Sequence, residues 1–318
     1  MSSEKTLRIG LIGAGAIAEA HAEALAGIPG VSCVCTADLN RKRLAQFRHT
    51  YGTVPYTDYR EMATKEMPDA VVISLPHALH EEAAVYCLNH GISVLLEKPM
   101  ANTSAQCKNI IHAAEESGAM LMIGHIQHYF PENNKAKELI CSGKFGKLAS
   151  ITDIRNIYYF TGERPKWFFD RQLSGGGILL NYGAHSLDKI QYITGLHIQN
   201  ITGKTAQQLD GFEIEGNAQL FVQYEQNVTA VISYCGYKGP MFNETTFYMT
   251  EGVIRLQTGV GLWASTGDDF YPVPVEPANE FRLMWEDFIH SLRTGAPSPI
   301  PGECGLSVVE AIEQVYNQ

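Results

Sequence analysis

The sequence lacks the cysteine patterns of secreted and zinc-binding proteins. Its seven cysteines are odd in number and scattered, and no pair has the Cys-x-x-Cys spacing. A disulfide framework and a structural zinc site are therefore not expected, and we predict no metal centre. The chain also lacks a run of about 18 apolar residues, the length that a membrane-spanning helix needs. Met1–Lys5 is polar and has no apolar signal core, so we expect a reduced, cytoplasmic protein without a membrane partner.

Positive charge is scarce as well. The 318 residues include 24 Lys and Arg against 34 Asp and Glu, which gives a formal net charge of -10, and no basic block stands out. Nucleic acid is therefore not expected as a partner, and a small molecule fits better. Hydrophobic residues make up 45% of the chain, as in ordinary globular proteins, and this length suits two domains with separate cores.

The first chemical signal is a glycine-rich turn between an apolar segment and an alanine-rich helix. Leu7–Ile12 is predicted to be a strand, and the turn that follows it has the sequence Gly13-Ala14-Gly15-Ala16-Ile17-Ala18. In a GxGxxA turn, Gly13 permits the tight bend and Gly15 lets the backbone approach a pyrophosphate. The helix N-terminus at Ala16 and Ile17 supplies N–H groups and partial positive charge to the phosphates. The segment therefore predicts a dinucleotide site.

Asp38 indicates which dinucleotide is bound. It ends a second predicted strand, Val31–Ala37, at the distance that the dinucleotide fingerprint requires. A carboxylate there accepts hydrogen bonds from the adenosine ribose and repels a 2′-phosphate, so NAD is favoured over NADP. Three basic residues follow Asp38 closely: Arg41, Lys42 and Arg43. Their side chains can reach a phosphate, but they can also be solvated charges in the first turn of the next helix.

The central apolar run ends in a lysine. Ile92–Leu96 is predicted to be a buried parallel strand, and it leads directly into Glu97-Lys98-Pro99, where the proline cannot continue a sheet ladder. Lys98 is therefore expected at the carboxyl edge, where open α/β sheets bind ligands. Pro76-His77 follows another predicted strand and belongs to the same edge. His80 comes next, and packing at a helix N-terminus explains it as well as a cofactor contact does.

Beyond Gly124 the alternation of strands and helices gives way to successive strands joined by short turns. This change predicts a Rossmann domain over residues 1–124, with a doubly wound parallel sheet, and a second domain over residues 125–318. The terminal helices can pack on either domain. We expect the second domain to be α+β and built on a mostly antiparallel open sheet. Its predicted strands are Leu148–Tyr159, Ile198–Gln207, Gly216–Tyr224, Thr229–Cys235, Glu244–Met249 and Gly252–Gln257.

A glycine-rich turn, Gly175-Gly176-Gly177, opens a predicted helix with a polar stripe. Asn181, His185 and Asp188 are spaced i, i+4 and i+7, so they share one face of that helix. A stripe of this kind, next to three glycines, can approach a ligand closely. It can equally well face water.

These motifs together resemble the Gfo/Idh/MocA family, which includes inositol dehydrogenase and glucose-fructose oxidoreductase. The resemblance covers nearly the whole chain. It implies an N-terminal Rossmann domain, a C-terminal domain whose open sheet mediates a homo-oligomer (a dimer or a tetramer), and NAD(P)-dependent chemistry on a hydroxyl of a sugar, cyclitol or related polyol. The matching residues are the GxGxxA turn, Glu97-Lys98-Pro99, Gly124-His125, Pro131, Gly143–Gly146, Trp167, Gly175–Gly177, His185 and Asp188.

The resemblance also implies catalytic roles for Lys98 and His185. When an alcohol is oxidised, its hydroxyl proton must go to a base while a hydride leaves the carbon. Lys98 suits this role if burial and a positively charged nicotinamide ring lower its pKa, and His185 can share or relay the proton. Glu97, Pro76 and His77 are expected to border the cofactor together with Lys98.

Substrate-binding residues are less clearly marked. Asn181 stands where the family often has an aspartate, and an amide binds a hydroxyl but cannot titrate. His128 stands where an arginine frequently follows the Gly-His turn, so we expect unusual substrate recognition. Tyr158 and Trp167 offer flat apolar faces to a sugar ring, and core packing explains them equally well.

Three functions remain open at this point. The leading hypothesis is an NAD(P)-dependent dehydrogenase that acts on CH–OH groups. A second is a redox-neutral glycosidase that holds its NAD tightly. A third is a non-catalytic NAD(P)-binding sensor, which Asn181 favours and which intact Lys98 and His185 oppose.

Overall fold

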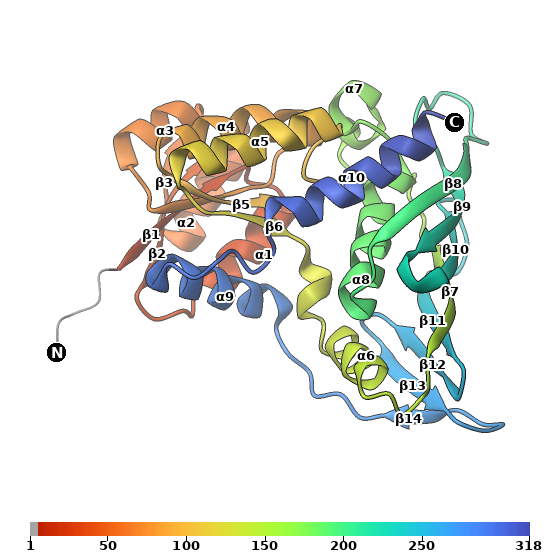
Figure 1. The fold of residues 1–318 in the computed structure, drawn as a ribbon. Helices are drawn as coiled ribbons and strands as arrows, with labels where there is room; N and C mark the ends of the chain where they lie inside the picture. The colour runs from red at the N-terminus through yellow and green to blue at the C-terminus, as the bar shows by residue number, and fades with distance from the viewer. Residues whose placement is uncertain (1–5) are drawn as a thin grey trace. The chain divides into compact units, whose positions relative to one another are not determined.

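The computed structural model describes residues 6–318, so the polar lead Met1–Lys5 lies outside the described residues. The chain forms two compact units (Figure 1). The first comprises the chain up to His125 together with Asn279–Leu306, and the second comprises Ile126–Ala278 together with Ser307–Gln318. None of the helices in residues 6–318 has both the length and the apolar character that crossing a membrane requires.

The first unit is built on a parallel sheet of six strands in the order β3-β2-β1-β4-β5-β6. This is the predicted doubly wound Rossmann sheet. The strands are β1 Leu7–Ile12, β2 Val31–Ala37, β3 Val54–Tyr56, β4 Ala70–Ile73, β5 Ser93–Glu97 and β6 Leu121–Gly124. The helices are α1 Ala16–Leu25, α2 Arg41–Tyr51, α3 Tyr59–Glu66, η1 His77–Leu79, α4 His80–Asn89, α5 Ser104–Ser117 and α9 Glu280–Thr294.

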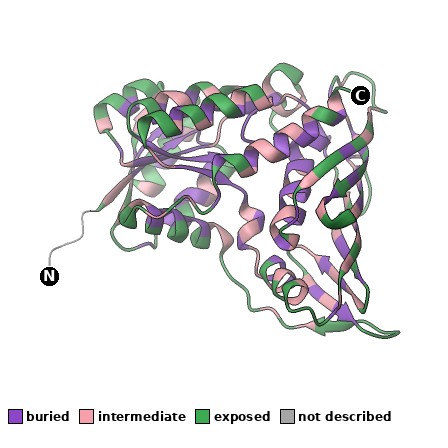
Figure 2. Ribbon diagram, in the orientation of Figure 1, coloured by how far each residue is buried: buried purple, intermediate pink, exposed green. Residues whose placement is uncertain are grey.

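Local sequence explains most of these elements. All residues of β4 and β5 are buried, as expected for strands covered by helices on both faces, and Figure 2 shows them within the buried interior. Helix α5 begins with a capping box between Thr103 and Gln106 and ends at Gly118, whose φ is +69°. The edge strand β3 was not predicted, because it has three residues and contains Pro55, which a sheet tolerates only at its edge.

Helix α9 belongs to the first unit, although the sequence prediction placed all of residues 125–318 in one domain. The indole of Trp285, which is fully buried, donates a hydrogen bond to His21 Nδ1 at 3.0 Å. At the other end of α9, the guanidinium of Arg293 donates to the carbonyl oxygens of Pro29 and Gly30. These contacts attach α9 to α1 and to the turn that follows α1. The contacting residues are more than 260 positions apart in the sequence, so no local pattern predicts them.

The second unit is built on eight strands in the order β14-β13-β12-β11-β7-β10-β9-β8. Only β7 and β10 pair in parallel, so the sheet is mostly antiparallel, as predicted. The strands are β7 Leu148–Asn156, β8 Ile198–Ala206, β9 Asn217–Tyr224, β10 Thr229–Cys235, β11 Phe242–Met249, β12 Gly252–Gln257, β13 Gly261–Ser265 and β14 Tyr271–Val273. The helical segments are η2 Ile126–Tyr129, α6 Pro131–Cys141, η3 Lys166–Phe169, α7 Arg171–Ser174, η4 Leu179–Gly183, α8 Ala184–Thr194 and η5 Glu225–Asn227. Helix α10, Gly302–Tyr316, begins in the first unit and continues into the second.

The sheet of the second unit has one buried face and one open face. In β9, residues alternate regularly between buried and exposed along the strand. The buried residues of β9 and β10, among them Leu220 and Ile232, join the core that α8 completes. The opposite face holds exposed apolar side chains, including Ile154, Phe221 and Val231, which are 43%, 44% and 52% exposed.

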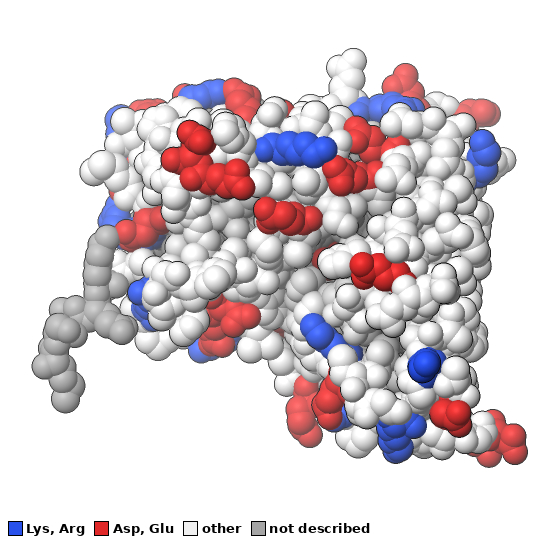
Figure 3. All heavy atoms as spheres, viewed as in Figure 1, with Lys and Arg blue, Asp and Glu red and all other residues white. Residues whose placement is uncertain are grey.

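One face of the molecule shows how charged side chains are distributed there. On the face shown in Figure 3, acidic and basic side chains are interspersed, and no continuous basic patch is visible. Within residues 6–318, no group of three or more His, Cys, Asp or Glu side chains is arranged to hold a metal ion.

Candidate functional site

The predicted phosphate-binding turn has the geometry that its glycines suggested. Gly13 has a φ of +101°, which a residue with a side chain rarely adopts, and its N–H donates to the carbonyl of Ala37 at 2.8 Å. A Cβ on Gly13 would lie 2.5 Å from the carbonyl oxygen of Ser74, which follows β4. Gly13 is therefore required for close packing of the turn between β1 and β4, the point where the strand order reverses.

The N-terminus of α1 is open at the same turn. Gly15 is the N-cap residue, no side chain caps the helix, and nothing lies within 4 Å of the position that a Cβ would take. Ala16 and Ile17 form the exposed first turn, and Ile17 is 47% exposed. Backbone N–H groups at a helix start attract phosphate, so this arrangement fits the pyrophosphate of a dinucleotide.

Asp38 lies beside this turn and is fixed by two backbone hydrogen bonds. Its Oδ2 accepts from the N–H of Ala14 and its Oδ1 from the N–H of Asn40, both at 2.7 Å. Each carboxylate oxygen keeps a further lone pair for a ribose hydroxyl. Asp38 borders a cavity of about 300 Å³ at the carboxyl ends of β1 to β4, lined also by Ile12, Ala37, Leu39, Thr57, Asp58, Tyr59, Arg60, Leu75, Leu79 and Glu82.

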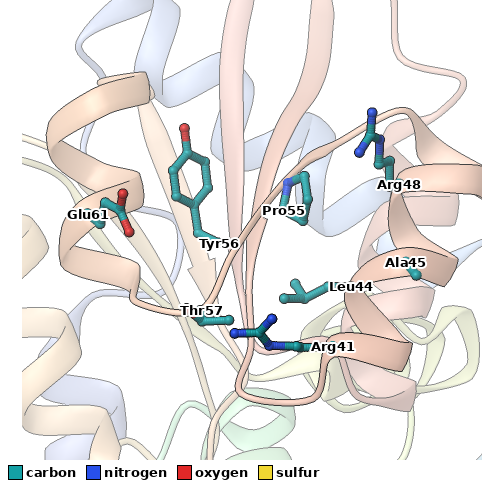
Figure 4. Close-up of a pocket in the computed structure, with 8 residues that line it drawn as sticks. All are labelled: Arg41, Leu44, Ala45, Arg48, Pro55, Tyr56, Thr57 and Glu61. Carbon is teal, nitrogen blue, oxygen red and sulfur yellow. The ribbon is translucent and has the colours of Figure 1, made fainter.

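The basic residues after Asp38 differ in their surroundings. Arg43 turns back onto the glycine-rich segment, where its Nε donates to the carbonyl of Ala14 at 2.6 Å and its guanidinium pairs with Glu19 at 3.0 Å. Arg41 lines a second cavity, of about 410 Å³, and Thr57 lines both cavities. Figure 4 shows Arg41 and Arg48 on either side of apolar side chains in this cavity. Arg43 is therefore held by protein groups, whereas Arg41 lines a cavity that Asp38 does not border.

Two turns follow β4 and β5 at this edge of the sheet. Pro76 and His77 follow β4, and the ring of His77, which is 4% exposed, contacts the ring of His80 edge to face at 5.9 Å. Lys98 follows β5 directly and is partly buried. The side chain of Glu97 is buried and accepts a hydrogen bond from the N–H of Lys98 at 3.2 Å. The structure thus brings the predicted cofactor residues of the first unit to one edge of one sheet.

In the second unit, the predicted polar stripe turns inward. Asn181 is 4% exposed and Asp188 is 3% exposed, so the stripe does not simply face water, and His185 between them is partly exposed. Asn181 lies in a π-helical turn, Leu179–Gly183, an irregularity that often marks functional sites. The amide of Asn181 lies 3.5 Å from the hydroxyl of Tyr159.

The other predicted substrate residues have different surroundings. The Nε2 atom of His128 lies 3.0 Å from a carboxylate oxygen of Asp188, and its ring stacks on Tyr192. Tyr158 is 38% exposed, whereas the ring of Trp167 stacks on Phe168 at 3.7 Å. Substrate contacts of His128, Tyr158 and Trp167 remain predictions.

A buried ion pair anchors helix α8, and the sequence did not reveal it. Asp153 on β7 and Lys189 on α8 are 0% and 1% exposed, and their charged groups are 2.9 Å apart. Asp153 also accepts hydrogen bonds from Ser186 at 2.7 Å and from Thr245 at 2.5 Å. Burial opposes the ionisation of Asp153, but the ammonium of Lys189 and the two hydroxyls outweigh it and hold its pKa below the usual value. Asp153 thus holds two positions on α8: Ser186, which lies within the segment from His185 to Asp188, and Lys189, which directly follows it.

Comparisons with known proteins agree with this geometry. Residues 7–125 match the family model described as "Oxidoreductase family, NAD-binding Rossmann fold", and residues 133–255 match the "GFO/IDH/MocA C-terminal domain". The chain is 30% identical to 2,7-anhydro-N-acetylneuraminate hydratase of Mediterraneibacter gnavus over 209 residues, 63% of this chain and 54% of that protein. It therefore spans about half the length of that relative.

Two further proteins are similar over most of the chain. The 4-carboxy-2-hydroxymuconate-6-semialdehyde dehydrogenase of a Sphingobium species is 26% identical over 301 residues, which are 91% of each chain. The crystal structure of aldose-aldose oxidoreductase from Caulobacter crescentus, complexed with glycerol, has a TM-score of 0.90 and 22% sequence identity, and the match covers 98% of this chain and 97% of that one. At this identity, the structural likeness shows the fold alone.

Proposed function

The chain belongs to the Gfo/Idh/MocA family of NAD(P)-binding oxidoreductases, and from this premise we propose that it is a dehydrogenase acting on the CH–OH group of a sugar, cyclitol or related polyol. The observation that carries the proposal is the arrangement of the first unit. The open helix start at Gly15, the carboxylate of Asp38 and the lysine after β5 all lie at the carboxyl edge of one sheet.

The proposed chemistry assigns separate tasks to a few side chains. The nicotinamide, when bound, accepts or returns the hydride. Lys98 takes the hydroxyl proton in oxidation and gives it back in reduction, and His185 shares that proton or orients the hydroxyl. Asn181 holds a second hydroxyl, because an amide can donate and accept hydrogen bonds without titrating.

The direct test is an absorbance assay for NADH with purified protein, NAD or NADP, and a panel of cyclitols, aldoses, ketoses and sugar acids. NADH formation with one stereochemical subset supports the proposal and gives the substrate class. A protein that binds NADH and oxidises no member of the panel contradicts it.

A redox-neutral reaction is the second candidate, and one observation favours it. The similar protein from Mediterraneibacter gnavus is named a hydratase, and adding or removing water changes no net oxidation state. Tightly held NAD can serve such a reaction by transient oxidation. Conversion of a glycoside or anhydro sugar without net NADH formation would identify this function.

We propose NAD rather than NADP as the cofactor, and Asp38→Asn tests this. The asparagine keeps the size of the side chain but loses the negative charge and one of the two acceptors for the backbone N–H groups. We expect kcat/KM for NAD to fall by about tenfold or more, because hydrogen bonds to a charged group contribute about 1.5–3 kcal/mol. The NADP to NAD ratio of kcat/KM should rise, since repulsion of the 2′-phosphate disappears. Asp268→Asn on an exposed loop is the matched control, and an unchanged ratio in Asp38→Asn would contradict the assignment.

We also propose that the open face of the second sheet forms a homo-oligomer. Val231 pairs across the sheet with Phe221, and both side chains are largely exposed. Apolar neighbours on an open sheet are typical of protein interfaces. Val231→Asp should therefore lower the mass measured by light scattering towards that of a single chain. Val260→Asp, at a position that is 75% exposed outside the strands, should leave the mass unchanged, and a monomeric wild-type protein would refute the proposal.

A further inference from the structure

The turn that contains Lys98 is held on both sides by buried histidines, neither of which belongs to the predicted site. His21 on α1 contacts Glu97, the residue before Lys98, and His80 on α4 contacts Pro99, the residue after it. The two imidazoles are 0% and 1% exposed. All of these residues belong to the first unit.

The upstream contact has a defined direction. The indole N–H of Trp285 can only donate, and it lies 3.0 Å from Nδ1 of His21, so Nδ1 must accept. The ring proton of neutral His21 is therefore on Nε2, which lies 3.0 Å from Oε1 of Glu97. If Nδ1 of His21 also carried a proton, its N–H would point at the indole N–H of Trp285, and no hydrogen bond could form between them. Trp285 thus selects the tautomer of His21 that donates to Glu97.

Glu97 passes this restraint to Lys98. Its second oxygen, Oε2, accepts the backbone N–H of Lys98 at 3.2 Å. Burial opposes the ionisation of Glu97, but the hydrogen bond from His21 and the nearby charge of Lys98 hold its pKa below the usual value, so both oxygens act as acceptors. The side chain fits only because Gly124 faces it: a Cβ there would lie 3.0 Å from Oε1.

The downstream contact ties together the turns after β4 and β5. Nδ1 of His80 lies 3.0 Å from the carbonyl oxygen of Pro99, and its Nε2 lies 3.0 Å from the carbonyl oxygen of Leu75. Both partners are acceptors, so each hydrogen bond needs a proton on the ring nitrogen. Burial lowers the pKa of His80, which favours the neutral ring and a single proton that bonds to either carbonyl. The ring of His80 therefore lies between the Lys98 turn and the Pro76-His77 turn and donates to one of them at a time.

We propose that His21 and His80 are positioning residues that form a two-sided clamp on the backbone at Lys98, fixing the direction in which its amine points. The inference rests on the proposed function of Lys98 as the acid/base group. The amine of a lysine lies at the end of a flexible four-carbon stem, so its position depends on how the backbone directs the start of that stem. Misplacement of a reacting group by about 1 Å can lower turnover about 10²-fold.

The first test needs no cofactor. Hydrogen exchange of the Lys98 amide, measured in the full-length protein, reports opening of its bond to Glu97. His21→Leu removes the donor to Glu97 and should speed this exchange by about tenfold or more, whereas His21→Gln, whose amide N–H can reach Glu97, should restore most of the protection. His112→Leu, at an exposed position on α5, is the control. Unchanged exchange in His21→Leu overturns the clamp.

The second test asks whether the histidine substitutions lower kcat through Lys98 or by disturbing the fold in general. In the wild-type background, His21→Leu and His80→Leu should each lower kcat for the most active polyol of the panel by about tenfold or more, with the Kd for NADH changed little. In a Lys98→Ala background the same substitutions should have almost no further effect on kcat, because a positioning residue acts only through Lys98. Equal losses in both backgrounds overturn the clamp.

The two tests also separate the clamp from the proposed function. If Lys98→Ala leaves turnover unchanged, the acid/base role of Lys98 fails, while the exchange measurement still decides whether His21 restrains the turn. If Lys98→Ala abolishes turnover and the histidine variants do not lower it, the proposed function stands and the clamp fails.

Discussion

Lys98→Ala is expected to lower turnover by about 10²- to 10⁴-fold, the usual contribution of a positioned acid/base group. The Kd for NADH, measured by fluorescence, should change little, because the phosphate and ribose contacts proposed for Gly15 and Asp38 remain. The loss should appear in kcat more than in KM, since the interaction is made in the transition state.

A matched lysine keeps this prediction specific. Lys204→Ala removes an exposed lysine from β8, a strand of the second unit, and should leave kcat and the Kd for NADH unchanged. If Lys98→Ala retains wild-type turnover, or if it loses NADH binding as strongly as turnover, Lys98 is not the acid/base group that we propose.

Asp153→Ala is expected to destabilise the protein by about 3–5 kcal/mol, measured by urea unfolding. The substitution leaves the ammonium of Lys189 buried without its partner and removes the acceptor of Ser186 and Thr245. Thr152→Ala, at the neighbouring position on the other face of β7, should cost far less, within about 0.5–1 kcal/mol.

A compensating variant tests whether the cost comes from the unpaired charge. The double variant Asp153→Leu/Lys189→Met removes both charges. Its free energy of unfolding should therefore fall by less than that of Asp153→Ala alone. A double variant that is worse than the single one would show that packing, and not the buried charge, dominates at this site.

The same pair predicts a pH dependence of defined sign. The pKa of Asp153 is lowered in the folded state, whereas in the unfolded chain it is about 3.9. The stability that the ionised carboxylate contributes is therefore fully present above about pH 4, and it is lost as the pH falls through the folded-state pKa. Asp153→Asn should show a flatter decline of the free energy of unfolding over that acid range.

The Rossmann half could be predicted closely because its signals are local. Each buried strand is a short apolar run, and the turns after them contain glycine, proline or charge at the positions where a parallel sheet ends. The start of α1 at Ala16 and the place of Lys98 after β5 both follow from such neighbours. The short strands β3, β13 and β14 were not predicted. Three to five residues are too few to show a clear alternation of apolar and polar side chains, and pairing with a neighbouring strand stabilises these segments.

The sequence by itself determined the two-sheet architecture and the dinucleotide turn, because period and spacing along the chain specify strands, helices and tight turns. It also supplied the candidate site residues, whose roles stay predictions. Only the tertiary structure decided which side chains support them. Glu97 and His21 are 76 residues apart, and Trp285 is 264 residues from His21. Contacts over such separations depend on how whole elements pack, and a histidine in an alanine-rich helix gives no local sign of its partners. The supporting contacts around Lys98 and the buried pair that holds α8 therefore became visible only once the elements were packed together.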